Sequence, residues 1–327
     1  MLSINKLMRP TRLVADIGGT NARFALLDVD GVPVRIQVLE CADYPDIESA
    51  IRDYLETIEE QPVLAVIAIA NPVTGDCITM TNHHWSFSVQ ALKAELGLKS
   101  LIVVNDFAAL ALSLPLLAGA DLVQVGGGLG VMDGPKGVIG PGTGLGVAGL
   151  VKSGSIWQAL AGEGGHVTLA AANDFESDII SAIRNQMGHV SAERILSGSG
   201  LALLRETIGF LRNEVVEPIT AEEITRRAIS GNDALCVEAV TVFCSMMGTM
   251  AGNLALTLGA SGGIYLGGGI LPQLGEFFVR SPFRSRFEDK GRFASYLASI
   301  PCYVIHAEYP ALTGASCYFK YYEGALP

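Results

Sequence analysis

The first third of the chain contains apolar runs of strand length, and between them lie segments with the apolar spacing of helices. Between residues 47 and 58, apolar side chains recur every three or four positions, which is typical of a helix that buries one face. Three consecutive strands followed by strand–helix units predict a mixed sheet. The predicted strands are 13–17, 24–29, 34–39, 63–70 and 101–105, and the predicted helices are 47–58, 88–96 and 107–114.

The pattern starts again after Pro115 with three more strands around a turn of Gly and Thr. We therefore expect two α/β lobes built on one plan, a small one of residues 1–116 with 308–327 and a large one of residues 117–307. Chance similarity between two glycine-rich hairpins is the alternative. The predicted strands are 138–140, 146–151, 156–161, 264–266 and 303–307, and the predicted helices are 174–187, 192–196, 200–211, 221–229, 234–258 and 311–322.

Composition is that of a compact enzyme-like protein. Of the 327 residues, 50% are hydrophobic and 17% are charged, which allows a large core and argues against disorder. The net charge of −11 repels nucleic acid and anionic membranes, so we expect neither as a partner. The six cysteines are scattered without a CxxC pair, which favours reduced, mostly buried thiols over disulfides or a zinc site.

Two segments decide whether a signal peptide or a membrane-spanning helix is expected. No apolar run precedes Leu13, so no signal peptide is expected. Residues 239–275 carry no charge, and Gly248 and Gly252 form a GxxxG pattern of the kind that joins membrane helices. Because polar residues and glycines interrupt this segment and no basic residues flank it, we prefer a helix buried inside a soluble protein.

Three glycine turns are candidate phosphate or nucleotide contacts. Paired glycines let backbone N–H groups converge on phosphate oxygens, as residues 16–20 and 142–144 can do after their strands. Ordinary hairpins with polar turns are the alternative. The glycines at 267–269 follow a buried strand, where the backbone can approach a flat ligand such as adenine. Neither the GxxxxGK[ST] phosphate loop nor the GxGxxG dinucleotide pattern fits these turns.

Several polar side chains follow buried strands and suit a polyhydroxylated ligand. A carboxylate at Asp106 can act as a general base, although an N-cap for the following helix is the competing interpretation. Carboxylates at Glu163 and Glu193, with Asn105 and His166, would accept several hydroxyl protons at once. A zinc site is the rival, but Glu163 and His166 lack HExxH spacing.

Eight segments carry a resemblance to a known family: ADIGGTNARFAL (15–26), NPVTGD (71–76), TNHHWSFS (81–88), NDFAA (105–109), GPGTGLGVA (140–148), EGGH (163–166), ERILSGSGL (193–201) and YLGGGI (265–270). Together they resemble the bacterial glucokinase family, in the family's order and over nearly the whole chain. The family's initial GD is Ala15-Asp16 here, so one glycine is lost. The zinc-binding CxCGxxGC motif of the related repressor and kinase superfamily is absent, which indicates the zinc-free branch.

The resemblance implies a two-lobed actin-like ATPase (ribonuclease H-like) fold with mixed sheets, with ATP and sugar in the cleft between the lobes. It implies that Asp106 is the catalytic base and also contacts the sugar. The other implied sugar ligands are Asn105, Glu163, His166 and Glu193. The implied ATP contacts are Ala15, Asp16, Ile17, Gly18, Gly19, Thr20, Gly142, Thr143, Gly144, Gly267, Gly268 and Gly269, and Mg²⁺ is expected to reach Asp16 through water.

The expected activity is ATP-dependent phosphorylation of glucose at its 6-hydroxyl by direct in-line transfer, the entry step of glycolysis, in a cytoplasmic homodimer. The nearer alternative is a kinase for another hexose such as mannose or fructose. In the family Glu193 faces the anomeric hydroxyl, which a ketose presents differently. The more distant alternative is a non-catalytic sugar sensor, which would be expected to carry a DNA-binding helix-turn-helix and a basic face. A phosphoryl donor other than ATP is also open.

Overall fold

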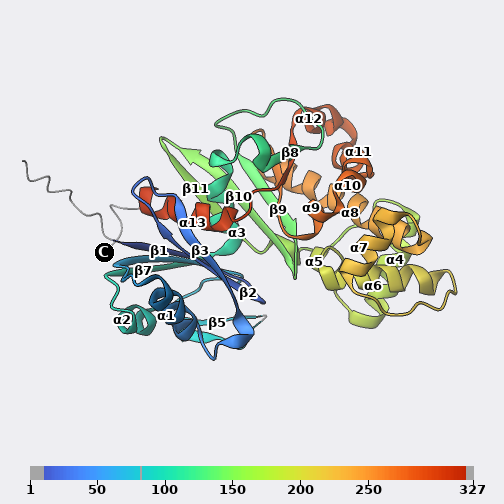
Figure 1. The fold of residues 1–327 in the computed structure, drawn as a ribbon. Coiled ribbons are helices and arrows are strands. Elements are labelled where there is room, and N and C mark those ends of the chain that lie inside the picture. Colours follow the sequence, from blue (N-terminus) through green and yellow to red (C-terminus); the bar gives the residue numbers. More distant parts are fainter. Residues whose placement is uncertain (1–10, 82, 322–327) are drawn as a thin grey trace, which may run out of the picture. The chain divides into compact units, whose positions relative to one another are not determined.

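A computed structural model describes residues 11–81 and 83–321. The signal-peptide prediction rests mainly on residues 1–10, one motif of the resemblance includes Asn82, and the predicted terminal helix ends at Tyr322. These positions lie outside the described residues. The chain divides into two compact units, Met1–Leu116 with Glu308–Pro327 (unit 1) and Leu117–Ala307 (unit 2) (Figure 1).

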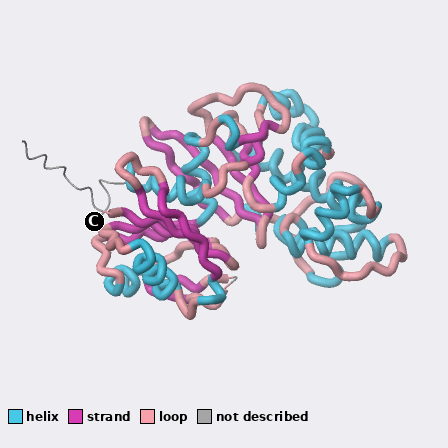
Figure 2. Tube along the Cα trace, viewed as in Figure 1, coloured by secondary structure: helices cyan, strands magenta, loops and turns pink. Residues whose placement is uncertain are grey.

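Unit 1 is built on a five-stranded sheet in the order β3-β2-β1-β4-β7. Figure 2 draws the strands of the protein in magenta. The first three strands pair antiparallel, whereas β1, β4 and β7 run parallel, so the predicted mixed sheet is confirmed. The second strand ends before the predicted Val29, because the Asp28 carboxylate accepts hydrogen bonds from two following backbone N–H groups and closes a turn. The strands are β1 (Arg12–Ile17), β2 (Asn21–Leu27), β3 (Pro33–Glu40), β4 (Leu64–Ile69) and β7 (Ser100–Asn105).

Helices cover both faces of this sheet. Leu13 of β1 faces the core formed with α1 and α2, whereas its neighbour Val14 faces α13, because successive strand side chains point to opposite faces. The sequence does not predict the small sheet of β5 and β6, whose strands are too short to show a pattern. These elements are β5 (Cys77–Thr79), β6 (Ser86–Ser88), α1 (Ile47–Ile58), α2 (Val89–Glu95), α3 (Asp106–Ser113) and α13 (Pro310–Tyr321).

Unit 2 repeats the strand plan of unit 1. Its six-stranded sheet has the order β11-β10-β9-β12-β13-β8, with β9, β10 and β11 antiparallel and β9, β12 and β13 parallel. The prediction that both halves share one plan is therefore confirmed, although the short strand β8 is not predicted. The strands are β8 (Leu122–Gln124), β9 (Lys136–Pro141), β10 (Leu145–Ser153), β11 (Ile156–Gly162), β12 (Ile264–Leu266) and β13 (Cys302–Ile305).

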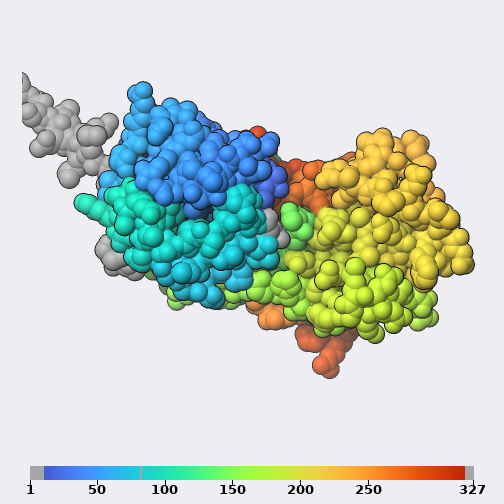
Figure 3. Space-filling view, turned by 90° about the horizontal axis from the view of Figure 1, so that it is seen from below, coloured from blue at the N-terminus to red at the C-terminus, as the bar shows by residue number. Residues whose placement is uncertain are grey.

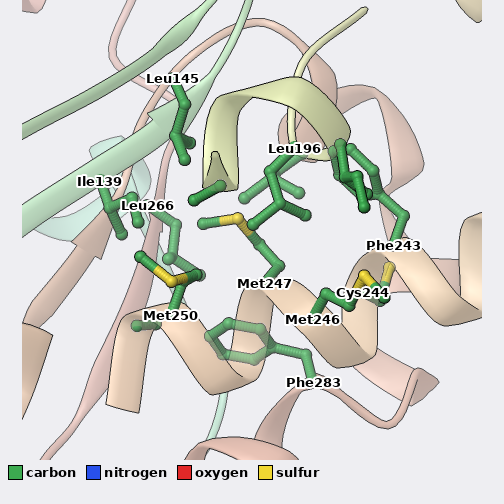
Figure 4. Packing of buried hydrophobic residues seen from close by; sticks show 14 of the residues in the cluster. Ile139, Leu145, Leu196, Phe243, Cys244, Met246, Met247, Met250, Leu266 and Phe283 are labelled. Carbon is green, nitrogen blue, oxygen red and sulfur yellow. The ribbon is translucent and has the colours of Figure 1, made fainter. Parts of the chain in front are cut away.

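The core of unit 2 is organised around one long helix, α8 (Ala234–Leu258). Its methionines Met247 and Met250 lie against sheet residues such as Ile139 and Leu266 (Figure 4). The helices α4 to α7 form the lobe drawn in yellow in Figure 3. The remaining helices are α4 (Asp174–Met187), α5 (Ala192–Ile195), α6 (Gly198–Leu211), α7 (Ala221–Ser230), α9 (Ile270–Leu274), α10 (Glu276–Arg280), α11 (Phe283–Glu288) and α12 (Ala294–Ser299).

The GxxxG pattern of α8 serves packing within the chain. By length and composition α8 could cross a membrane, but 67% of its most apolar stretch of 18 residues is buried inside the structure. A Cβ at Gly248 would meet the carbonyl oxygen of Phe283, and a Cβ at Gly252 would meet that of Phe287. The two glycines therefore let α8 and α11 approach closely, and α8 is an internal helix of unit 2.

The cysteines do not form disulfides in this structure. All six are free thiols; Cys77 is exposed and the other five are buried. Burial raises the pKa of the Cys244 and Cys302 thiols to about 12. Within residues 11–81 and 83–321, no group of three His, Cys, Asp or Glu side chains could hold a metal ion.

Candidate active site

A pocket of about 450 Å³ in unit 2 brings two of the predicted glycine turns together. Gly142 and Thr143 of the second phosphate turn lie on its wall with Gly269 of the adenosine turn. The first residues of α6 and α7 complete it, so backbone N–H groups of two helix starts lie at the pocket, where they favour an anionic ligand.

The two glycine turns are held in contact by their backbones. The turn after β12 continues the parallel pairing with β9, and Gly267 N–H donates to the carbonyl of Ile139 at 3.0 Å. A Cβ at Gly140 would meet the carbonyl of Gly267, and a Cβ at Gly268 would meet the carbonyl oxygen of Pro141. Gly268 also has a φ of +76°, which L side chains rarely adopt. Glycine is therefore required on both sides of this contact.

Three predicted sugar ligands form one polar cluster in unit 2. Glu163 follows β11, His166 ends the short 3-10 helix that comes next, and Glu193 lies in α5. His166 lies 3.9 Å from Glu163 through Nε2 and 3.9 Å from Glu193 through Nδ1. All three side chains are accessible, with exposed fractions of 53%, 60% and 32% for Glu163, His166 and Glu193.

Local packing fixes this cluster. A Cβ at Gly165 would meet the carbonyl oxygen of Leu145, so the 3-10 helix lies directly on the start of β10. Ala192 N–H donates to the carbonyl of Val167 at 2.9 Å, which ties α5 to the segment that carries His166. The Glu-Gly-Gly-His spacing thus reflects the close approach of three backbone segments.

The first phosphate turn lies at the end of β1 in unit 1. Asp16 has a 19% exposed side chain and pairs with Arg23 of the neighbouring strand at 3.3 Å. Burial raises the pKa of Asp16, and the nearby Arg23 guanidinium opposes the rise. Ala15 and Ile17 have fully buried side chains, so only their backbones are available to a ligand.

Asn105 and Asp106 lie at the same sheet edge as Asp16. The parallel register aligns Ile17 of β1 with Ile69 of β4, and Ile69 with Asn105 of β7. With strands about 4.8 Å apart, the ends of β1 and β7 are about 10 Å from each other. The predicted phosphate contact and the predicted base therefore share the carboxyl edge of the sheet, where α/β proteins usually bind ligands.

The structure corrects one interpretation of Asp106. The N-cap of α3 is Asn105, whose Oδ1 accepts from Ala108 N–H at 3.1 Å, and Asp106 is the first helical residue. The Asp106 carboxylate accepts from Phe107 N–H at 2.8 Å and from Asn105 Nδ2 at 3.1 Å through the same oxygen, Oδ1. Helix α3 begins one residue earlier than the cap interpretation requires, which leaves the Asp106 carboxylate oriented by its neighbours.

Comparison with known proteins gives the family. A family model described as Glucokinase matches residues 13–322. The chain belongs to the glucokinase family. The glucokinase of Aromatoleum aromaticum is 53% identical over 308 residues, which cover 93% of each chain. The glucokinase of Neisseria meningitidis serogroup B is 51% identical over 313 residues, which cover 95% of each chain.

Solved glucokinase structures have the same fold. The glucokinase from an Antarctic psychrotroph matches with a TM-score of 0.84 and 35% identity, over 95% of this chain and 99% of that one. The glucokinase from Balamuthia mandrillaris, solved in complex with glucose, matches with a TM-score of 0.82 and 18% identity, over 97% and 95% of the two chains. The actin-like ATPase fold expected from the sequence is therefore confirmed.

Some residues of this pocket are not predicted from the sequence. Ser199, Thr220 and Gln273 line the same pocket as Gly142 but lie far from it along the chain. Thr220 is visible in the sequence only as a cap for the helix at 221–230. In unit 1, the carboxamide of Asn71 binds Thr79 and Thr81, and its backbone carbonyl accepts from Asn105 Nδ2 at 3.5 Å. Asn71 therefore anchors a loop beside the predicted base.

Proposed function

We propose that the protein is an ATP-dependent glucokinase that transfers the γ-phosphoryl group of ATP to the 6-hydroxyl of glucose. Glucokinases about half identical over more than nine tenths of the chain carry this proposal. The chain also keeps the side chains that the transfer needs: a carboxylate at Asp106, and backbone turns suited to phosphate at residues 18–20 and 142–144.

The proposed chemical step is direct and needs no covalent intermediate. Asp106 Oδ2 or Oδ1 accepts the proton of the sugar 6-hydroxyl as that oxygen attacks the γ-phosphorus, and ADP leaves. The hydrogen bonds from Asn105 and Phe107 hold the carboxylate in a fixed orientation, so little reorganisation is required when the sugar binds. In phosphoryl transfer, positioning and electrostatic stabilisation supply most of the rate.

The proposed sugar ligands are Asn105, Asp106, Glu163, His166 and Glu193. Glucose offers several hydroxyl groups, and accessible carboxylates such as Glu163 and Glu193 can each accept more than one hydrogen bond. The backbone of Gly165 cannot carry a side chain without displacing Leu145, which keeps the cluster compact.

The proposed nucleotide site is the pocket lined by Gly142, Thr143 and Gly269. Nine of its twelve lining residues are Gly, Ala, Ser or Thr, and Glu222, Ile270 and Gln273 are the larger ones. The small residues allow the close approach of a flat base and phosphate groups. The 450 Å³ of the pocket falls in the range usual for small-molecule sites. The turn Gly18-Gly19-Thr20 is proposed as the second phosphate contact.

Mg²⁺ is proposed to reach the protein through water at Asp16. Asp16 is a carboxylate at the start of the first phosphate turn. Among the described residues, no group of three His, Cys, Asp or Glu side chains around it could hold a metal ion. This fits an Mg²⁺ that keeps most of its water and takes its other ligands from phosphate oxygens. When bound, the ion would offset the phosphate charge.

The assay that tests the function measures ADP release with MgATP against glucose, mannose, fructose and N-acetylglucosamine, with a blank that contains no sugar. We expect turnover with glucose to exceed that with each other sugar. Faster turnover with mannose or fructose would show that this hexose, and not glucose, is the preferred substrate. Folded protein that releases no ADP with any sugar would overturn the kinase proposal.

We also propose a cytoplasmic homodimer. Six free thiols, five of them buried, suit a reducing compartment. The edge strand β11 carries the exposed apolar side chains Ile156 and Leu160, which a second copy could cover. Size-exclusion chromatography with light scattering tests the dimer, and a monomeric mass at micromolar concentration would refute it.

A further inference from the structure

The two carboxylate oxygens of Glu193 have different surroundings. Oε1 lies 3.9 Å from His166 Nδ1, in the cluster proposed to bind the sugar. Oε2 accepts a hydrogen bond from the backbone N–H of Leu145 at 2.8 Å. Leu145 is the first residue of β10 and directly follows the turn 142–144, so one side chain contacts both the sugar cluster and the phosphate turn.

The glycine at position 144 leaves the space that this carboxylate occupies. A Cβ built on Gly144 would meet Oε2 of Glu193, and the atoms next nearest to it are also those of Glu193. Gly144 has no positive φ that would by itself require glycine. The absence of a side chain at Gly144 therefore serves the position of the Glu193 carboxylate.

A second hydrogen bond joins the same two segments. Gly198 N–H, at the start of α6, donates to the carbonyl of Gly142 at 2.9 Å, and Gly142 N–H donates to the carbonyl of Gly144 at 2.8 Å. The segment 193–198 thus holds the phosphate turn at both ends, once through the Glu193 carboxylate and once through the backbone.

Core packing fixes the two segments independently of any ligand. Leu145, at one end of the carboxylate contact, is 5% exposed, and Leu196, three residues after Glu193, is fully buried. Both side chains point into the core formed around α8 (Figure 4). The carboxylate is therefore the adjustable part of this link, because the backbones on either side of it are anchored.

We propose that Glu193 is a positioning residue for the nucleotide phosphates, in addition to its proposed role as a sugar ligand. By holding Leu145 N–H, it fixes the turn 142–144 in the conformation that receives phosphate. Without an acceptor, this partly buried N–H must find water, and the turn relaxes. The inference rests on the proposed function, because it takes residues 142–144 as a phosphate contact.

The test measures the affinity for ADP in the absence of any sugar, by calorimetry, in the wild type and in Glu193→Ala. A residue that binds only sugar would leave this affinity unchanged. We expect the dissociation constant for ADP to rise at least about tenfold, as for the loss of a hydrogen bond to a charged group. Glu163→Ala is the matched control, since among the described residues no hydrogen bond joins Glu163 to residues 142–145, and it should keep the wild-type value.

Glu193→Gln separates positioning from general loss of structure. Its amide oxygen can still accept from Leu145 N–H, so ADP affinity should return to within about threefold of the wild type. Its affinity for glucose should stay low, because the negative charge facing the sugar is gone. ADP affinity that is normal in Glu193→Ala, or equally low in Glu193→Ala and Glu193→Gln, would overturn the inference.

Gly144→Ala tests the link from the other side. The new methyl group displaces the end of a flexible side chain rather than backbone, so the protein should fold. We expect the KM for glucose to rise at least about tenfold, although position 144 lies in the phosphate turn. An unchanged KM for glucose in folded Gly144→Ala would overturn the inference. Wild-type protein that binds no ADP would instead overturn the nucleotide assignment itself.

Discussion

Asn105 both caps helix α3 and orients Asp106. Its Oδ1 accepts from Ala108 N–H, while its Nδ2 donates to the Asp106 carboxylate at 3.1 Å. The residue that begins the helix thus also fixes the group proposed as the base. Because the two roles use different atoms of one side chain, substitutions can separate them.

Asp106→Asn should abolish turnover while leaving the site assembled. The amide oxygen can still accept from Phe107 and Asn105, but it cannot take a proton at neutral pH. We expect kcat to fall at least about a thousandfold, within the upper range of general-base effects, with glucose affinity nearly unchanged. Coupled assays give kcat, and calorimetry gives glucose affinity. Near-normal turnover would remove Asp106 from the role of base.

Asn105→Asp should keep the helix cap and lose the orientation of the base. Aspartate caps helices about as well as asparagine, so the free energy of unfolding should change by less than about 1 kcal/mol. The donor to Asp106 is replaced by a second negative charge, so kcat at saturating glucose should fall at least about tenfold. Asn105→Ala is the contrast, which should also lose about 1 kcal/mol of stability. Full activity of Asn105→Asp would show that this hydrogen bond does not matter.

Gly268→Ala should damage nucleotide binding as well as stability. The new side chain would meet the carbonyl of Pro141 and would require an unfavourable φ of +76°. Gly231→Ala is a matched control, because Gly231 has a φ of +70° and open space around its Cβ position. The control should lose about 1 kcal/mol of stability with normal kinetics. Gly268→Ala should lose more and raise the KM for ATP at least about tenfold; equal behaviour of the two variants would argue against the backbone contact.

Alkylation should distinguish one cysteine from the other five. Cys77 is exposed, whereas burial raises the pKa of Cys244 and Cys302 to about 12 and that of Cys317 to about 11. The thiolate is the reactive form, and at pH 8 a thiol with a pKa of 12 is ionised in about one molecule in ten thousand. Iodoacetamide should therefore label Cys77 alone in the native protein and all six thiols after unfolding, as counted by mass spectrometry. Rapid native labelling of a second cysteine would contradict the burial.

The regular elements of this chain are predictable because their signals are local. The bounds of α4, α8 and β12 agree with the sequence prediction, since side-chain caps at Asn173 and Asp233 and a left-handed glycine at Gly259 mark the helix ends. The four short helices between residues 270 and 299 are not predicted. Their positions depend on contacts with distant segments, such as that of Phe283 with Gly248, which no local pattern contains.

Only those residues of the candidate site that have a local signal in the sequence can be predicted. Glycine turns and carboxylates after strands are visible in the sequence, but Gln273 reaches the pocket only through the fold. The cap of α3 shows a second limit. Asn and Asp are equally good caps, so the sequence cannot decide between Asn105 and Asp106. The strand ends at Asn105 as predicted, and the helix begins one residue earlier than predicted, at Asp106.

Helix α13 has a consequence for how the protein folds during synthesis. Leu312 and Phe319 bury Val14 and Val66 on one face of the unit 1 sheet, and Gly314 allows contact with the backbone of Ala109. The ribosome makes residues 11–116 before it makes residues 310–321. The nascent segment 11–116 therefore carries an uncovered apolar sheet face until α13 has been made, and a chain that ends before residue 310 would be prone to aggregation.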